Sequence, residues 1–95
     1  MEKSEEELRG ELVHVFASMT DEDEVEALLS DLFTEREIRD QASRLQVAKM
    51  LRSGISYSEI EKLTGVSATT ISRVSKCLSH GSGGYKFALS HLENC

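Results

Sequence analysis

The sequence predicts a small all-α protein of about six helices. Every apolar pattern along the 95 residues has a helical period, and no run alternates between apolar and polar residues as a half-buried strand would. Proline is absent, so no ring forces a helix to break. Only five residues are aromatic, so a core must be built from Leu, Val, Ile and Ala.

A chain of this length is expected to fold as a single domain, residues 1–95, with little core of its own. Such a domain buries only ~60–65% of the surface that its unfolded chain exposes, and a dimer with a shared core would bury more. No apolar run approaches the ~20 residues of a membrane span, and the acidic start does not resemble a signal peptide. We therefore expect a soluble, cytoplasmic protein with no membrane partner.

The net charge of −6 is unevenly distributed. Residues 1–33 carry eleven acids and two bases, residues 34–78 carry five acids and eight bases, and residues 79–95 balance. DNA binding requires local positive potential, so the middle stretch can approach a duplex while the acidic stretch is repelled from it. The alternative is that the acids only form a solvated helix face.

Two amphipathic helices are expected within residues 1–33. Ser4-x-x-Glu7 forms a capping box for the first, and Thr20 or Asp21 can cap the second. Their apolar faces are rich in leucine and consist of Leu8, Leu12, Val15, Phe16, Met19, Val25, Leu28, Leu29, Leu32 and Phe33. We interpret residues 1–33 as acidic dimerisation helices, and packing onto the same chain's core is the alternative.

A long core helix is expected over residues 34–54. Thr34-x-x-Glu37 marks its start and Gly54 its end. Its apolar positions are Ile38, Ala42, Leu45, Val47, Ala48, Met50 and Leu51. It also carries five bases, Arg36, Arg39, Arg44, Lys49 and Arg52, some of which could reach DNA phosphates, although solvated surface is the simpler interpretation for any one of them.

Residues 56–78 form the pattern of a helix-turn-helix, two short helices joined by a tight turn. Ser56-x-x-Glu59 caps the first helix, Gly65 allows the turn, and Ser67 can cap the second helix. Ile71, Val74 and Leu78 recur at three and four residues, so one side of the second helix should face inward. A helical hairpin without DNA-binding function is the alternative.

The opposite side of that second helix should face solvent with groups that contact DNA. Thr69, Thr70 and Arg73 would read base edges, with Ser72 on the same side, and Ser67, Lys76 and Arg52 would hold phosphates. This arrangement predicts an interface for double-stranded DNA.

A flexible break, Gly81-Ser82-Gly83-Gly84, separates the motif from a short C-terminal helix over residues 85–93. Of the two cysteines, Cys77 is expected to pack as a small apolar residue, and the spacing of the pair suggests neither a disulfide framework nor a zinc site.

The chain lacks the residue groupings that catalysis requires. His14, His80 and His91 lie on different elements, so no close-spaced pair of metal ligands exists. No nucleophile–base constellation and no phosphate-cradling glycine loop are present. We expect no enzymatic activity, no metal and no cofactor.

The motif and its flanks resemble the Trp repressor-like family, and within it the YerC/YecD group of small stand-alone helix-turn-helix proteins. The resemblance covers residues 32–85 and rests on LFTEREIRDQASRLQVAKMLRSGISYSEIEKLTGVSATTISRVSKCL followed by GSGGY. It implies an all-α fold of about six helices, an intertwined homodimer, and two recognition helices that enter successive major grooves.

The resemblance also implies a location for an effector pocket. Trp-binding members hold tryptophan between one arginine on the long helix and one on the recognition helix; Arg73 matches the second, and Arg44 is the candidate for the first. Val74, however, stands where those members have glycine, and its side chain would occupy the space of the indole ring. We therefore predict that tryptophan is not the corepressor and leave any small-molecule effector unidentified.

Two functional hypotheses follow. The first is a sequence-specific DNA-binding transcriptional regulator, such as a repressor, that acts as a homodimer. The second is a protein-interaction module that keeps the fold without DNA binding and uses its acidic N-terminal helices as the partner surface.

Overall fold

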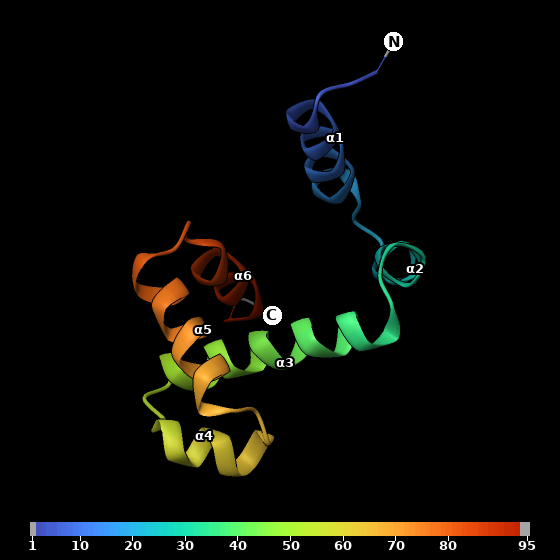
Figure 1. Ribbon diagram of the computed structural model, residues 1–95. Helices are drawn as coiled ribbons and strands as arrows, with labels where there is room; N and C mark the ends of the chain where they lie inside the picture. The colour runs from blue at the N-terminus through green and yellow to red at the C-terminus, as the bar shows by residue number, and fades with distance from the viewer. Residues whose placement is uncertain (1, 94–95) are drawn as a thin grey trace. The chain divides into compact units, whose positions relative to one another are not determined.

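The computed structural model describes residues 2–93, which form six α-helices and no strand (Figure 1). The helices are α1 (Glu5–Ser18), α2 (Glu22–Leu32), α3 (Glu35–Arg52), α4 (Tyr57–Thr64), α5 (Ala68–His80) and α6 (Gly84–Glu93). The predicted all-α class and the number of helices are confirmed. The chain divides into two compact units, Met1–Ile38 and Arg39–Cys95, and α3 begins in the first and continues into the second.

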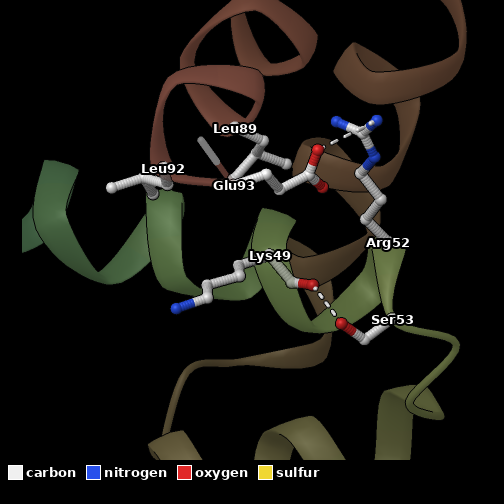
Figure 2. A pocket seen from close by; sticks show the side chains of 6 residues that line it. All are labelled: Lys49, Arg52, Ser53, Leu89, Leu92 and Glu93. Atoms are coloured by element: carbon white, nitrogen blue, oxygen red, sulfur yellow. Dashed lines mark hydrogen bonds and ion pairs between the residues drawn. The ribbon is translucent and has the colours of Figure 1, made fainter. Parts of the chain in front are cut away.

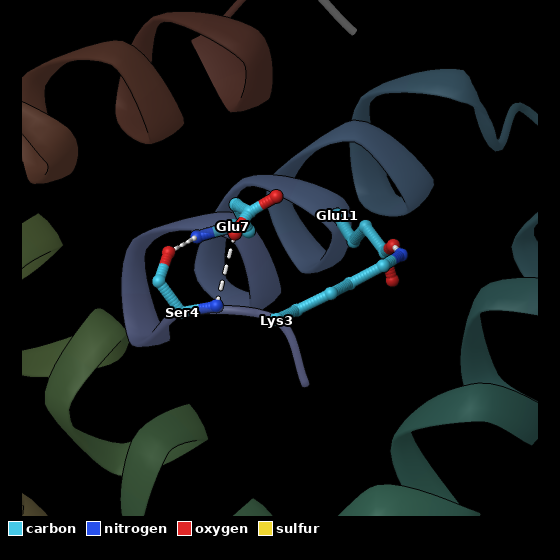
Figure 3. A network of polar contacts seen from close by, with 4 residues as sticks. All are labelled: Lys3, Ser4, Glu7 and Glu11. Carbon is cyan, nitrogen blue, oxygen red and sulfur yellow. Dashed lines mark hydrogen bonds and ion pairs between the residues drawn. The ribbon is translucent and has the colours of Figure 1, made fainter. Parts of the chain in front are cut away.

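Helix α1 in the first unit begins with a complete capping box (Figure 3). The Glu7 N–H donates to Ser4 Oγ at 3.1 Å, and the Ser4 N–H donates to Glu7 Oε1 at 3.0 Å. Hydrogen bonding from the Ser4 backbone N–H, with a smaller contribution from the Ser4 side chain, lowers the pKa of the Glu7 carboxyl below its usual value. Lys3 forms an ion pair with Glu11 beside the box. Local polar groups therefore fix the start of α1.

Helix α2 is capped by Asp21, whose Oδ1 accepts hydrogen bonds from the N–H groups of Asp23 and Glu24. Neither α1 nor α2 contains a buried residue. Several large apolar side chains of the unit are exposed instead, namely Leu8, Leu12, Val13, Val15, Leu32 and Phe33. The first unit therefore has well-defined helices but no core of its own.

The second unit is built around one apolar core to which α3, α4, α5 and α6 all contribute. Its buried members are Val47, Ala48, Met50, Ile60, Ile71, Val74 and Leu89. Helix α3 ends where Gly54 adopts a left-handed conformation with φ +85°, which allows the Ile55 N–H to donate to the Met50 oxygen at 3.1 Å. This termination turns the chain into α4 beneath the core.

Two expectations about burial are wrong. Cys77 is exposed, because the buried stripe of α5 passes through Ile71 and Val74 and leaves residue 77 on another side of the helix. Ala42 is also exposed, although its spacing placed it on the apolar stripe of α3.

In residues 2–93, no helix has both the length and the apolar character needed to cross a bilayer.

Candidate nucleic-acid interface

The turn between α4 and α5 has the geometry of a helix-turn-helix. Gly65 ends α4 in the left-handed region with φ +75°, and its N–H donates to the Glu61 oxygen at 2.9 Å. The Thr64 hydroxyl donates to the Ile60 oxygen at 2.7 Å and accepts from the Val66 N–H at 3.1 Å. The chain can therefore turn sharply with its backbone groups satisfied, as the glycine at this position predicted.

Helix α5 buries one side and exposes the other. Ile71 is fully buried and Val74 is 2% exposed, and both pack into the core with Ile60 of α4. This packing fixes the rotation of α5 about its own axis, so the residues on the opposite side must face solvent. The orientation of the exposed side is thus set by the core rather than by surface contacts.

The exposed side of α5 presents four polar residues, which we call the reading face: Thr69, Ser72, Arg73 and Lys76. Together with Ala68 they line a shallow hollow of about 490 Å³. Neither cation of the reading face forms an ion pair with any residue in the described range 2–93. The reading face therefore offers two free positive charges, two hydroxyls and no acid.

The other predicted contacts at the start of α5 have partners within the protein. Ser67 Oγ accepts a hydrogen bond from the Thr70 N–H at 3.3 Å and donates to Thr70 Oγ1 at 3.1 Å. Ser67 thus caps α5, as predicted, while Thr70 is half-buried at the edge of the reading face. Thr70 retains its own hydroxyl proton for an additional acceptor.

Arg52 lies at the end of α3 and does not line the hollow of the reading face. Its guanidinium is 3.8 Å from the Glu93 carboxylate of α6 (Figure 2). It helps to line a different hollow, of about 270 Å³, with Lys49, Ser53, Leu89, Leu92 and Glu93. Arg52 therefore lines other hollows than Thr69, Ser72, Arg73 and Lys76 do.

The two arginines expected to frame an effector pocket line separate hollows. Arg73 belongs to the reading face, whereas Arg44 is half-buried in a hollow of about 370 Å³ beside the turn. That second hollow is lined by Asp40, Ser43, Arg44, Thr64, Gly65, Val66, Ser67 and Thr70. No sequence pattern indicated Asp40 and Ser43, because only the packing of α3 beside the turn brings them there.

A groove of about 420 Å³ lies where the α5–α6 connection meets α3. It is lined by Gln41, Leu45, Cys77, Gly81, Ser82, Gly84, Tyr85 and Ala88. Burial raises the pKa of the Tyr85 hydroxyl above its usual value, the negative charge of a Cys77 thiolate adds to this, and the positive charge of Arg44 opposes it. The groove is more apolar than the reading face and carries no cation.

Metal binding finds no support in the part of the chain that the structure describes. Over residues 2–93, no three His, Cys, Asp or Glu side chains gather closely enough to hold an ion.

The chain is similar over nearly its whole length to proteins of one family. The family model described as Trp repressor protein matches residues 7–93. YerC, an uncharacterised protein of Bacillus subtilis (strain 168), is 42% identical over 90 residues, which cover 90% of this chain and 86% of that protein.

Two crystal structures share the fold. A TrpR-like protein from Eubacterium eligens is 37% identical with a TM-score of 0.81, and the match covers 88% of this chain and 87% of that chain. A Staphylococcus aureus protein solved as a candidate Trp repressor is 33% identical with a TM-score of 0.82, covering 97% of this chain and 96% of that chain.

Proposed function

Since the chain belongs to the Trp repressor family, we propose that it is a sequence-specific DNA-binding transcriptional regulator that acts as a homodimer. The resemblance noted over residues 32–85 is confirmed, and the fold is Trp-repressor-like. The family is regulatory and not enzymatic, so the site has to be understood as a binding surface. DNA as the ligand implies a cytoplasmic protein.

The observation that carries this proposal is the reading face. A core on one side of α5 holds Arg73 and Lys76 outward on the other, and neither is neutralised by a neighbouring acid in residues 2–93. A rigid helix with unpaired cations and short hydroxyl side chains suits a major groove, where arginine reads guanine and threonine contacts either base edges or the thymine methyl. We assign base contacts to Thr69, Thr70 and Arg73, and phosphate contacts to Lys76 and Ser67.

The homodimer is supported by the first unit. Leu8 is 54% exposed and Leu32 47% exposed, and no residue of α1 or α2 is buried. Apolar side chains left open along two whole helices are uncommon in a stable monomer, so a second copy is the natural partner. We propose that residues 1–33 intertwine with that copy and complete one domain of residues 1–95. The two α5 helices would then meet a near-palindromic operator about one DNA turn, or ~34–36 Å, apart.

We propose further that tryptophan does not control this protein. Val74 is 2% exposed and occupies core space next to the α5 backbone, where glycine would leave a gap. Arg44 and Arg73 line different hollows, which does not favour a flat ring held between their two guanidinium groups. Calorimetric titration with L-tryptophan should give no saturable heat, and micromolar saturable binding would contradict this.

Selection of random duplexes on the purified protein tests the proposal. We expect enrichment of one sequence and a mobility shift that weakens steeply with salt. Arg73→Ala should cost about 1–3 kcal/mol on the selected duplex and relax the preference at one base pair. Lys49→Ala, which removes an exposed cation of α3 outside the reading face, is the matched control.

Failure to shift any duplex at low salt would contradict the proposal. The exposed apolar and acidic surface of α1 and α2 would then favour a protein-interaction module.

A further inference from the structure

A second cationic hollow lies beside the reading face. It has a volume of about 400 Å³ and lies between the end of α3, the second half of α5 and the start of α6. Its lining residues are Leu51, Arg52, Ser75, Leu78, Ser79 and Lys86. We call it the serine hollow.

All the polar side chains of the serine hollow can donate hydrogen bonds, and none is acidic. Arg52 and Lys86 supply two positive charges, and Ser75 and Ser79 supply two hydroxyls. Neither the serine hydroxyls nor the Lys86 ammonium has a partner within residues 2–93. Two cations beside two unpaired hydroxyls form the donor set with which proteins hold phosphate oxygens.

The serine hollow is continuous with the reading face along α5. Ser75 of the hollow follows Ser72 of the reading face by three residues, and Ser79 of the hollow follows Lys76 of the reading face by three, which places the two sets on neighbouring strips of the helix. When a helix lies in the major groove, residues on its flank meet the phosphates of the strand that borders the groove. The hollow therefore lies where a backbone strand would pass.

We propose that the serine hollow binds a phosphate of the DNA backbone and that Glu93 competes with this phosphate for Arg52. The inference rests on the proposed function: it restores the phosphate contact that the sequence predicted for Arg52 and adds Lys86, Ser75 and Ser79. The Arg52 guanidinium is 3.8 Å from the Glu93 carboxylate, and both side chains are about half exposed, so the pair can open at little cost (Figure 2). Figure 2 also shows the Lys49 ammonium pointing away from Arg52.

Two variants that break the same ion pair separate this role from a structural one. Arg52→Gln removes the cation that would hold phosphate, whereas Glu93→Gln removes only its competitor. We expect Arg52→Gln and Lys86→Gln each to weaken binding roughly three- to tenfold and to lower the slope of log affinity against log salt by about 0.9 per copy. Glu93→Gln should tighten binding by about two- to fivefold. Lys49→Gln is the control and should change the affinity little.

The assay uses the full-length protein, the selected duplex, and an unrelated duplex of equal length. A phosphate contact should weaken both duplexes by the same factor, because it carries no sequence information. The inference is overturned if Arg52→Gln and Lys86→Gln behave like Lys49→Gln, if they affect the selected duplex alone, or if Glu93→Gln weakens binding as Arg52→Gln does.

Titration of inorganic phosphate, followed by the amide resonances of Ser75 and Ser79, distinguishes a free anion from the backbone. Saturation at low millimolar phosphate together with unchanged DNA affinity in Arg52→Gln would assign the hollow to a free anion and overturn the inference. If the unmodified protein shifts no duplex at all, the proposed function fails first and the DNA role of the hollow fails with it. If the unmodified protein binds DNA and the Arg52→Gln and Lys86→Gln variants bind it with the same affinity, only the proposal that the serine hollow binds phosphate is overturned.

Discussion

The two units of the chain use similar apolar side chains in opposite ways. In the second unit, Val47, Ile60 and Ile71 are fully buried between four helices. In the first, Leu12 and Phe33 remain about two-fifths exposed although the helices that carry them are well capped. Capping and helical period thus determine where a helix begins and ends, but burial requires an opposing surface. The second unit contains that surface, and we attribute the missing one in the first unit to a second copy of the chain.

The charges of the two units differ in the same direction. Residues 1–38 carry thirteen acids and three bases, and residues 39–95 carry four acids and eight bases. The second unit therefore combines a closed core with a positive surface, which suits a nucleic acid. The first unit combines an open apolar face with a negative surface, which suits a protein partner and would be repelled by phosphates. This difference supports separate roles in DNA contact and dimerisation.

The largest effect should come from opening the core of the second unit. Ile60→Ala removes a fully buried side chain where α4 meets the rest of the core, and should lower the free energy of unfolding by about 2–5 kcal/mol. Leu63→Ala on the same helix is the control, because its side chain is 63% exposed and should matter by only about 0.5 kcal/mol. Urea denaturation measures both. Equal losses would show that α4 does not pack as described.

The next largest effect tests the apolar face of the first unit. Leu12→Glu places a charge on the stripe of α1 that we assign to the dimer interface. Because both copies carry the substitution, a symmetric interface would contain two such charges. Dimerisation should weaken by roughly thirtyfold, or about 2 kcal/mol, as sedimentation equilibrium can measure. Val13→Glu, one residue along and off that stripe, should leave the dimer intact. If Val13→Glu dissociates the protein and Leu12→Glu does not, the assigned face is wrong.

Two glycines provide a smaller contrast between the units. Gly65→Ala forces a side chain into the left-handed turn and should destabilise the protein by about 1–2 kcal/mol. Gly10→Ala lies in the interior of α1 with nothing within 4 Å of the new methyl, and should stabilise by about 0.5–1 kcal/mol. Thermal unfolding at one fixed protein concentration compares them. A neutral Gly65→Ala would mean that the turn is not held at φ +75° in solution.

The features that the sequence predicted correctly are those that depend on neighbours three or four residues away. The capping boxes at Ser4 and Thr34, the cap at Ser67 and the turn at Gly65 all follow from local hydrogen bonding and backbone sterics. The buried stripe of α5 and the exposure of Arg73 follow from the helical period.

The features that it missed depend on which element packs against which. Cys77 was expected to pack as a small apolar residue, but it is exposed while Ile71, Val74 and Leu78 pack in or against the core. Lys86, Ser75 and Ser79 come together only because α6 packs beside α5, and no spacing in the chain predicts this. Arg44 and Arg73 were expected to frame one effector pocket, but each lines a different hollow. These features depend on tertiary packing, so the periodicity of the sequence could not predict them.

The smallest effect concerns Tyr85 in the groove beside α6. Burial raises the pKa of its hydroxyl in the folded protein above the unfolded value of about 10, so the unfolded chain loses this proton first as pH rises. The contribution of Tyr85 to stability is therefore complete below about pH 10 and is lost as pH rises through the folded pKa. Tyr85→Phe should flatten the alkaline fall of the unfolding free energy. Tyr57→Phe removes the other tyrosine, whose side chain is 45% exposed, and should retain that fall. Phenolate absorbance of the folded protein during alkaline titration gives an independent measure. Identical alkaline profiles for the two variants would show that Tyr85 is not half-buried in solution as it is beside α3 and α5.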